Sequence, residues 1–471
     1  MRQTTSNRKA GQTVKGVIDG WVGATRVASN FPTLQSAIDD LPETGGSVYV
    51  PPGVYQEAIQ IRTPNVTLLG TWDSIVKTPD NAEQLVNDAA IRVLADGCRI
   101  EGIQIDGNKV NNPALDGPTN GPARWADGVG VYANDCTITK CYIHDMLGHG
   151  IIVWNEGFDD IPKGSRQNII IDGNIIKNGK WRSHIDIAST DPTAPLNQKV
   201  TISNNVCIGT EDAPTGNEHG ITTHTAQKVM IIGNHVENLS NGLNIHTGSI
   251  EVVAQANTVT NSINAGILVD NNSDKISCIT NTIKSISSVG RGVIVRNSTD
   301  VCISGNDIDA ELEAIWIRGA TEKIFVTDNR ASSELESCIL ISDDINYVEV
   351  SRNRISAPFT KQGIRDLPTS AITGNLITGN YIYAGAQGIA STTPHTDISG
   401  NVIDGATVSG ILVRAPNIRV SNNRINGTDR GIQFDLEPAN VILDGNKFIS
   451  VADKLFNTPG TNLVEVNSFE Q

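Results

Sequence analysis

Histidine is unevenly distributed in this sequence of 471 residues. Seven of the eight histidines lie between positions 144 and 246, and only His395 lies elsewhere. Imidazole is the side chain that most readily gains or loses a proton near neutral pH, and two acids, Asp186 and Glu218, occur in the same stretch. We therefore predict a catalytic site in this part of the chain, built from five residues: His149, His184, Asp186, Glu218 and His219.

Side chains suited to holding a substrate surround these candidates. Aromatic rings that could stack on the flat faces of sugars are Trp125, Tyr132, Trp154 and Trp181. Two cations, Lys180 and Arg182, could pair with a carboxylate of the substrate. The predicted binding set is completed by four polar residues further along the chain: His224, Asn244, His246 and Asp270.

Three kinds of activity are open to this set of residues. The first is proton abstraction beside a uronate carboxylate, which gives elimination or C5 epimerisation, with Lys180 or Arg182 as the neutralising cation and a histidine exchanging protons. The second is glycoside hydrolysis, which needs two carboxyl groups about 5 Å or about 6.5–9.5 Å apart. Asp186 and Glu218 are the predicted pair for that reaction. The third is binding without chemistry.

No cofactor is expected from the sequence. It contains no CxxC pair and no DxDxDG calcium loop. The histidines and acids named above leave a divalent metal open, although none of their spacings is diagnostic. The seven cysteines mostly lie within apolar runs, so we expect buried free thiols that behave as small hydrophobic side chains.

An internal repeat indicates which elements position these residues. One unit reads Asn, two apolar residues, a spacer, a Gly or small residue, and a short Ile/Leu/Val-x-Ile/Val run. The Asn recurs, mostly every 21 to 25 residues, at Asn174, Asn205, Asn234, Asn257, Asn281, Asn306, Asn329, Asn353, Asn380, Asn401, Asn423 and Asn446. The Gly recurs in step at Gly128, Gly150, Gly220, Gly242, Gly266, Gly292, Gly363, Gly388, Gly410 and Gly431. Its place is taken in three other units by His184, Ala314 and Cys338.

Each repeat supplies about three short strands, and no such strand can bury its apolar face alone. Stacking equivalent strands of successive repeats buries all of these faces in one core. The LxxLxLxxN signature of leucine-rich repeats is missing, and a propeller blade needs about 40 residues or more. We therefore predict an all-β fold, a right-handed parallel β-helix of about a dozen coils. Its repeated asparagines should form a hydrogen-bonded ladder in turns that tolerate left-handed backbone geometry.

The two ends of the chain depart from the repeat. The segment FPTLQSAIDDLP places Leu34, Ala37 and Ile38 on one face of a short helix, with Thr33 as its N-cap. Such a helix would cover the open end of a solenoid core. We predict three parts: an N-terminal tail and lead-in over 1–30, the β-helix with its helical cap over 31–450, and a C-terminal cap over 451–471.

In the strands that follow the repeated Gly, side chains alternate between the core and the surface. Ile151, Val153, Ile185 and Ile187 should point inward, so Asp186 should point outward. Because neighbouring coils lie about 4.8 Å apart, outward residues far apart in sequence should form one stripe. The longest insertions also fall on the coils between Gly150 and Gly220, where they would form the walls of a groove.

Composition excludes several classes of protein. There are 51 acidic and 36 basic residues, giving a formal net charge of −15, which argues against nucleic acid as the main partner. No run approaches the roughly 18 apolar residues of a membrane span, and the N-terminus shows no apolar signal-peptide region.

Two segments carry a family resemblance. TLQSAIDDLPETGGSVYVPPGVY resembles the opening of proteins in the pectin lyase-like β-helix superfamily. IEGIQIDGNKVNNPALDG, followed by CYIHDMLGHGI, resembles the catalytic modules of mannuronan C5-epimerases and is similar to phage tailspike depolymerases. The epimerase motif Tyr-Gly-x-Asp-Pro-His falls on positions 149 to 154, where this chain has His149, Ile152 and Trp154 instead of Tyr, Asp and His. The resemblance therefore implies the fold and the location of the site, but not alginate epimerisation.

The sequence thus favours an enzyme that cleaves or remodels an extended polysaccharide in a groove spanning the coils from His149 to Asp270. The alternative is a non-catalytic β-helix that serves as a virion structural or receptor-binding protein. The expected partner is a polysaccharide, with neither nucleic acid nor membrane. The tailspike resemblance implies a homotrimer or a virion assembly, and an extracellular or virion-associated location.

Overall fold

The structure is a computed structural model that divides into two compact units, Met1–Val206 and Cys207–Gln471, and each is described by itself. The residues whose structure is described are 24–80, 89–112, 127–155, 162–180, 182–189, 196–210, 218–285, 289–343, 345–358, 360–368, 374–383, 385–435, 438–457, 463–466 and 469–470. Strand β18 (Val206–Ile208) contains the boundary between the units. None of the described helices is long and apolar enough to span a membrane.

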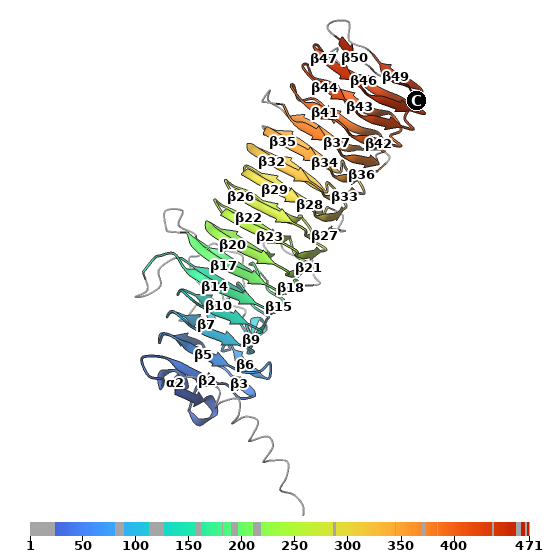
Figure 1. Cartoon of the computed structure of the whole chain (residues 1–471). Coiled ribbons are helices and arrows are strands. Elements are labelled where there is room, and N and C mark those ends of the chain that lie inside the picture. Colours follow the sequence, from blue (N-terminus) through green and yellow to red (C-terminus); the bar gives the residue numbers. More distant parts are fainter. Residues whose placement is uncertain are drawn as a thin grey trace, which may run out of the picture. The chain divides into compact units, whose positions relative to one another are not determined.

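The first unit consists of three parallel sheets (Figure 1). Sheet A contains β1 (Ala24–Val27), β2 (Gly46–Tyr49), β5 (Val66–Leu69), β8 (Arg99–Glu101), β11 (Thr137–Thr139), β14 (Gln167–Asp172) and β17 (Asn197–Ser203). Sheet B contains β3 (Gly53–Tyr55), β6 (Ser74–Lys77), β9 (Gln104–Asp106), β12 (Tyr142–His144) and β15 (Ile175–Lys177). Sheet C contains β4 (Ile59–Ile61), β7 (Ala89–Val93), β10 (Asp127–Val131), β13 (Ile151–Trp154) and β16 (Ile185–Ala188).

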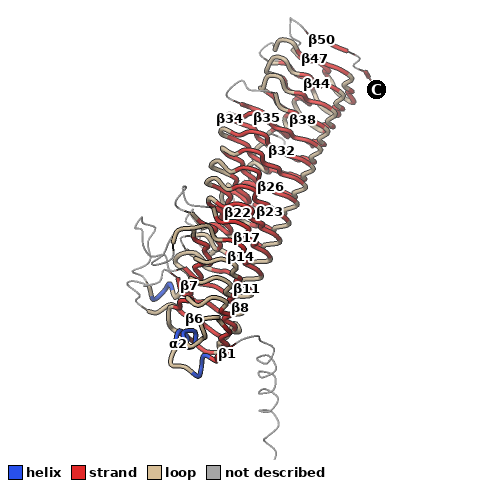
Figure 2. Tube along the Cα trace, turned by 60° about the vertical axis from the view of Figure 1, so that its left-hand side comes forward, coloured by secondary structure: helices blue, strands red, loops and turns tan. Residues whose placement is uncertain are grey.

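The second unit repeats the same arrangement (Figure 2). Its sheet A contains β20 (Ala226–Ile232), β23 (Ile250–Gln255), β26 (Asp274–Ile279), β29 (Thr299–Ser304), β32 (Thr321–Thr327), β35 (Ile345–Ser351), β38 (Leu376–Thr378), β41 (Asp397–Ser399), β44 (Arg419–Ser421), β47 (Val441–Asp444) and β50 (Leu463–Val466). Its sheet B contains β21 (His235–Glu237), β24 (Thr258–Thr260), β27 (Thr282–Ser285), β30 (Asp307–Ala310), β33 (Arg330–Ser333), β36 (Arg354–Ser356), β39 (Tyr381–Tyr383), β42 (Val402–Asp404), β45 (Arg424–Asn426), β48 (Lys447–Ile449) and β51 (Phe469–Glu470). Its sheet C contains β19 (His219–His224), β22 (Asn241–His246), β25 (Ala265–Val269), β28 (Arg291–Arg296), β31 (Ile315–Arg318), β34 (Ile339–Asp343), β37 (Gln362–Pro368), β40 (Gln387–Ser391), β43 (Ser409–Val413), β46 (Arg430–Phe434) and β49 (Asp453–Phe456).

The predicted parallel β-helix is confirmed, but the predicted number of coils is too low. Each coil adds one strand to sheet C, and the 16 described strands of that sheet correspond to about 16 coils rather than a dozen. The prediction counted coils by their ladder asparagine, which is first recognisable at Asn174. In the preceding coil the equivalent position is occupied by Cys141, whose backbone N–H donates to Oδ1 of Asn174 over 2.9 Å. Coils without the asparagine were therefore missed.

Both units have aliphatic cores, as the alternating pattern requires. Ile151, Val153, Ile185 and Ile187 are fully buried, which confirms that they point inward. Six of the seven cysteines are also buried, and Cys302 is partly buried, which confirms the predicted buried thiols. Burial raises the pKa of the Cys98 thiol to about 11, so this group stays protonated and apolar in character.

The asparagine ladder is present in both units. The backbone N–H and the side-chain Nδ2 of Asn281 both donate to Oδ1 of Asn306, over 2.8 and 3.0 Å. The left-handed backbone geometry, however, belongs to the residue before the ladder asparagine. Thr280 has φ of +53° and Gly305 has φ of +66°. None of the ladder asparagines has a positive φ. The left-handed residue of the predicted turn is therefore the one before the asparagine, and the asparagine side chain fills the space inside the turn.

The repeated Gly is required by close packing between strands. A Cβ on Gly266 would lie 2.3 Å from the side chain of Ile283 and 2.9 Å from the carbonyl oxygen of Gly292. Two coils further on, the equivalents of Gly266 and Ile283 are Ala314 and Ala331, both buried. At this coil the larger residue at the Gly position is thus accompanied by a smaller residue facing it.

We expect Gly266→Ala to lower the free energy of unfolding by about 1–3 kcal/mol, because the added methyl group overpacks the core. Urea unfolding of four proteins (wild type, Gly266→Ala, Ile283→Ala and the double variant) measures the coupling. The Gly266→Ala change should cost less when Ile283 has already been shortened. Equal costs in both backgrounds would show that the Ile283 contact is not the reason for the glycine.

A short helix forms where the sequence predicts one. Helix α2 (Leu34–Asp39) follows the short 3-10 helix η1 (Ala28–Asn30) and lies beside β1 (Figure 2). It also contacts β4. The side chain of Thr33 accepts a hydrogen bond from the backbone N–H of Ser36, which completes a capping box. A second 3-10 helix, η2, covers Lys109–Asn111. That α2 closes the end of the core remains a prediction.

The predicted domain boundaries also remain predictions. Strand pairing occurs on both sides of them: β1 pairs with β2 before residue 31, and β49 pairs with β46 after residue 450.

Candidate active site

The candidate site of the first unit lies on the outward face of sheet C. Register places Asp186 on β16 beside Ile152 on β13, and Ile152 beside Gly130 on β10. Ile185 and Ile187, the neighbours of Asp186 in its strand, are fully buried in the core. Because side chains alternate along a strand, the carboxylate of Asp186 leaves the sheet on the opposite side, as predicted.

His149 connects two carboxylates on this face. Its Nε2 lies 3.3 Å from Oδ2 of Asp186, and its Nδ1 lies 3.0 Å from Oδ1 of Asp127. The backbone N–H of His149 also donates to Oδ1 of Asp127 over 2.6 Å. The exposed fractions are 3% for Asp127, 2% for His149 and 5% for Asp186. We call these three residues the Asp–His–Asp cluster.

The cluster brings together two of the predicted catalytic residues, and the third member, Asp127, was missed. A signal for it was present in the sequence. His149 and His219 had been noted because each immediately precedes a repeated Gly, and Asp127 precedes Gly128 in the same way. The residue before the Gly lies at the edge of sheet C, where it can reach its equivalent in the next coil.

The charged groups of the cluster stabilise one another. Burial alone would lower the pKa of His149, but Asp127 and Asp186 outweigh it and raise that pKa to about 9. His149 is therefore an imidazolium at neutral pH, and each ring N–H faces a carboxylate. Arg182 is close enough for both acids to favour its charged form, although burial is the larger effect and lowers its pKa.

The raised pKa of His149 predicts a pH dependence of stability. The ordinary pKa is 6.5 and the folded value is about 9, so folding is favoured by proton binding. This contribution, a few kcal/mol, should be complete below pH 6.5 and should disappear as the pH rises through about 9. Urea unfolding of the wild type across this range should show that loss, and His149→Gln should be less stable at pH 6 and less sensitive to pH. The exposed His395→Asn should behave like the wild type, and parallel curves for wild type and His149→Gln would contradict the assignment.

The other predicted residues of the first unit surround the cluster with differing exposure. The ring of Trp154 meets the imidazole of His149 edge-on, with centroids 6.4 Å apart. His184 is buried, and a Cβ placed on Gly179 would lie 3.6 Å from its Nε2. Lys180 and Arg182 are half-buried. Trp125 and Trp181 lie outside the described residues.

Tyr132 and Arg92 form a further contact on this face. The guanidinium carbon of Arg92 lies 5.6 Å from the centroid of the Tyr132 ring, and both side chains are buried. Arg92 is in register with Gly130 and thus belongs to the same outward column as Asp186. Arg92 is not among the predicted site residues, because its strand precedes the histidine-rich stretch. The predicted stacking of Tyr132 on a sugar remains a prediction.

The predicted residues of the second unit lie on or beside strands β19, β22 and β25 of sheet C, and two of them share one column. His224 is in register with His246, and their ring centroids are 3.7 Å apart. Nδ1 of His219 lies 3.4 Å from Nδ2 of Asn241. Glu218 and Asn244 are buried. The predicted approach of Glu218 to Asp186, which concerns two different units, remains a prediction.

The carboxylate of Asp270 is paired with an arginine of the same chain. Its Oδ1 accepts a hydrogen bond from Nε of Arg296 over 2.8 Å, and its Oδ2 contacts the NH2 group of the same arginine. Asp270 is 2% exposed, whereas the side chain of Arg296 is 43% exposed, so the arginine lies between the carboxylate and solvent. A role in substrate binding would require the ion pair to open.

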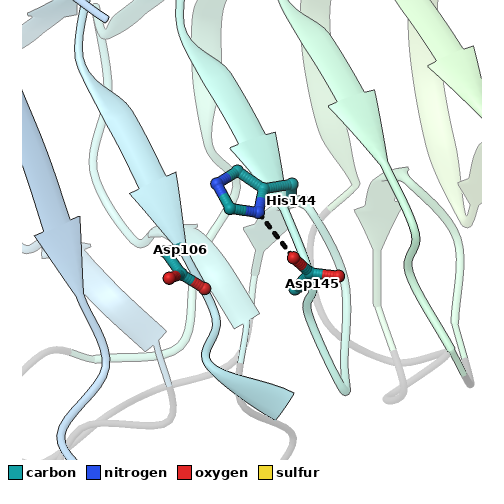
Figure 3. Close-up of side chains that lie close together, drawn as sticks. All are labelled: Asp106, His144 and Asp145. Carbon is teal, nitrogen blue, oxygen red and sulfur yellow. Dashed lines mark hydrogen bonds and ion pairs between the residues drawn. The ribbon is translucent and has the colours of Figure 1, made fainter. Parts of the chain in front are cut away.

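A second group of titratable side chains lies on sheet B of the first unit. Asp106, His144 and Asp145 place potential metal-ligand atoms within 4.8 Å of one another (Figure 3). Two lysines already supply positive charge there: Lys109 Nζ is 3.5 Å from Asp145, and Lys77 Nζ is 3.7 Å from Asp106. The hydrogen bond from His144 is the main reason that the pKa of Asp145 is lowered. The two lysines therefore already compensate the negative charge of Asp106 and Asp145.

The comparisons with known proteins agree on the fold. A family model described as "Right handed beta helix region" matches residues 90–283. A search of curated proteins finds no match. The pre-mature gene product 12 of bacteriophage phi29 is similar in structure, with 11% identity and a TM-score of 0.54, over 98% of this chain and 76% of that chain. A mutant tailspike protein of E. coli bacteriophage HK620, solved in complex with a hexasaccharide, shows 13% identity and a TM-score of 0.50, over 89% and 73%.

A third solved structure is more distant in shape. The A-module of mannuronan C-5 epimerase AlgE6 from Azotobacter vinelandii shows 14% identity and a TM-score of 0.32, over 95% of this chain and 99% of that chain. At such identities the phage similarities establish the fold alone. The chain is a right-handed parallel β-helix, as the sequence predicted.

Proposed function

We propose that this right-handed parallel β-helix is an enzyme that acts on a uronate-containing polysaccharide at the Asp–His–Asp cluster. The observation that carries the proposal is the buried imidazolium of His149 between two carboxylates on the outward face of sheet C. Buried groups whose pKa is shifted by specific charged partners are concentrated at catalytic sites. The hexasaccharide bound to the HK620 tailspike supports the choice of an extended glycan.

Proton abstraction fits the cluster better than hydrolysis. Asp127 accepts two hydrogen bonds from His149, one from the backbone and one from the ring, so it acts as a positioning residue. We assign Asp186, which faces Nε2 of His149 over 3.3 Å, as the base on a sugar C–H bond, and the protonated His149 as the acid. Arg182, half-buried beside both acids, would neutralise the sugar carboxylate. Hydrolysis would require a second carboxyl group free to reach the glycosidic oxygen.

The experiment is incubation of the protein with polygalacturonate, alginate and neutral dextran. Ultraviolet absorbance of an unsaturated uronate would identify elimination, and uptake of solvent deuterium at C5 without chain cleavage would identify epimerisation. New reducing ends without unsaturation would identify hydrolysis and contradict the proposed chemistry. An unchanged polymer in every case would contradict the enzyme proposal.

A non-catalytic role as a virion structural or receptor-binding protein is the second candidate. The observation in its favour is the burial of the cluster, since none of its three members is more than 5% exposed. Paired charges buried to this degree also occur as purely structural elements. The similarity to two phage proteins supports a virion-associated or extracellular location for either candidate. Assembly as a homotrimer is implied by the tailspike resemblance of the sequence. Sedimentation of the purified protein tests the trimer.

A further inference from the structure

A shallow groove lies on the outward face of sheet B in the second unit. It has a volume of about 270 Å³ and crosses strands β33, β36 and β39. The outward residues that line it are Arg330, Ser332, Arg354, Ser356, Tyr381 and Tyr383. None of these residues belongs to the predicted site or to the Asp–His–Asp cluster.

Strand register explains the shape of the groove. Arg330, Arg354 and Tyr381 form one outward column, and Ser332, Ser356 and Tyr383 form the next. Between the columns, Ala331, Ile355 and Ile382 point into the core and are buried. The two serines are small, so the surface is lowered beside the longer arginine and tyrosine side chains.

Two tyrosine rings on this face are exposed to solvent. Tyr381 is 42% exposed and Tyr383 is 50% exposed. The hydroxyl of Tyr381 donates to Oδ2 of Asp404 over 2.7 Å, which fixes its ring. The ring of Tyr383 lies over Gly405, where an added Cβ would be only 3.3 Å away. Exposed rings held in one orientation offer a surface on which a sugar can stack at little entropic cost.

Cations line one side of the groove, although the chain as a whole is acidic. The chain carries a formal net charge of −15. From Arg330 the outward column continues, through Arg354, Tyr381 and Val402, to Arg424 and Lys447, with no acid among these six residues. Asp307 precedes Arg330 in this column, and Asp309 and Asp404 lie in the neighbouring one. Arg330 pairs with the exposed Asp307 over 2.7 Å, and the Arg354 guanidinium lies 5.9 Å from the Tyr381 ring centroid. Cations beside exposed rings suit a ligand that combines a sugar face with a negative charge.

We propose that this groove is a second binding site, which holds an acidic sugar unit of a polysaccharide outside the catalytic cluster. The proposal rests on the proposed function for the class of polymer. The rings of Tyr381 and Tyr383 stack on the sugar, and Arg354 and Arg330 bind its anionic group. The hydroxyl of Ser356 exchanges hydrogen bonds with the sugar hydroxyls, and that of Ser332, which donates to Oδ1 of Asp309, accepts one. Carboxylate and sulfate groups share this chemistry.

Binding measurements on the full chain test the groove. Affinity electrophoresis compares polygalacturonate, which carries carboxylates, with dextran sulfate and neutral dextran. Tyr383→Ala and Arg354→Ala should each weaken binding of at least one acidic polymer by about tenfold. Matched controls are Tyr347→Ala on sheet A and Arg352→Ala, an exposed arginine paired with Asp328, and both should bind like the wild type. Thermal unfolding verifies that each variant remains folded.

The outcomes separate this proposal from the catalytic one. The same measurements are made in an Asp186→Asn background, in which binding at the groove should persist whether or not activity is lost. Unchanged affinity in Tyr383→Ala and Arg354→Ala overturns the proposal, as does equal binding of dextran and the acidic polymers. A change in sedimentation mass in these variants without a loss of binding would identify the face as a contact between copies of the chain and would also overturn it.

Discussion

Asp186→Asn is expected to reduce turnover of the uronate polymer by at least about 100-fold, because the amide cannot accept a proton from carbon. The substitution preserves the shape of the side chain, and its amide can still lie beside His149. Initial rates with the polymer identified by the substrate panel provide the measurement. The pH profile should change as well, because the pKa of His149, which Asp186 helps to raise to about 9, should fall.

A matched control separates catalysis from stability. Asp366 is also a fully buried aspartate on sheet C, and it accepts hydrogen bonds from Asn375, Ser391 and Thr393. Burial is the main reason that its pKa is raised, so an amide should be tolerated there. Asp366→Asn should retain activity, whereas Asp186→Asn should not. Full turnover in Asp186→Asn would eliminate the Asp–His–Asp cluster as the active site.

The second large effect concerns the asparagine ladder. Asn281→Ala should lower the free energy of unfolding by about 3–5 kcal/mol, since the loss leaves several buried groups without partners. Oδ1 of Asn281 accepts from both the backbone N–H and Nδ2 of Asn257 over 3.0 Å. Its own Nδ2 donates to the carbonyl of Ala254 over 2.9 Å and to Oδ1 of Asn306 over 3.0 Å.

Urea unfolding followed by circular dichroism measures this loss. Asn426→Ala is the control, because Asn426 is half-buried on sheet B and its side chain donates to Asp404 over 2.8 Å outside the ladder. That variant should lose about 1 kcal/mol or less. Similar losses in the two variants would show that the ladder bonds contribute no more than an ordinary side-chain hydrogen bond.

The fold could be predicted from the sequence because the Asn and Gly repeat, and the alternation of inward and outward side chains, recur from coil to coil. Ile151 and Ile185 had to point inward, and the outward direction of Asp186 followed from them. The number of coils could not be obtained in this way, because the coils before Asn174 lack the ladder residue that was counted. The sequence did not indicate which turn residue is left-handed, because that position is occupied by residue types as different as Thr280, Gly305 and Arg352.

The candidate site was predicted less completely than the fold. His149 and Asp186 were identified as members of one site, but Asp127 was not, because alternation along a strand does not determine where a residue at the strand edge points. The groove at Tyr383 was missed for a different reason. Its residues lie in regular strands without insertions, and their collective shape arises only when three coils are superimposed.

The asparagine ladder has a consequence for how such a chain can change in length. Each ladder residue presents the same donors to one neighbour and the same acceptor to the other, so the pattern is independent of which two coils meet. Loss of residues 306–328 would join the left-handed Gly305 directly to Asn329 and restore the same turn. Insertion or deletion of one whole coil therefore preserves the hydrogen bonds of every ladder turn. Insertion or deletion of part of a coil would leave a buried polar group without a hydrogen-bond partner. The ladder therefore allows the β-helix to lengthen by duplication of whole coils.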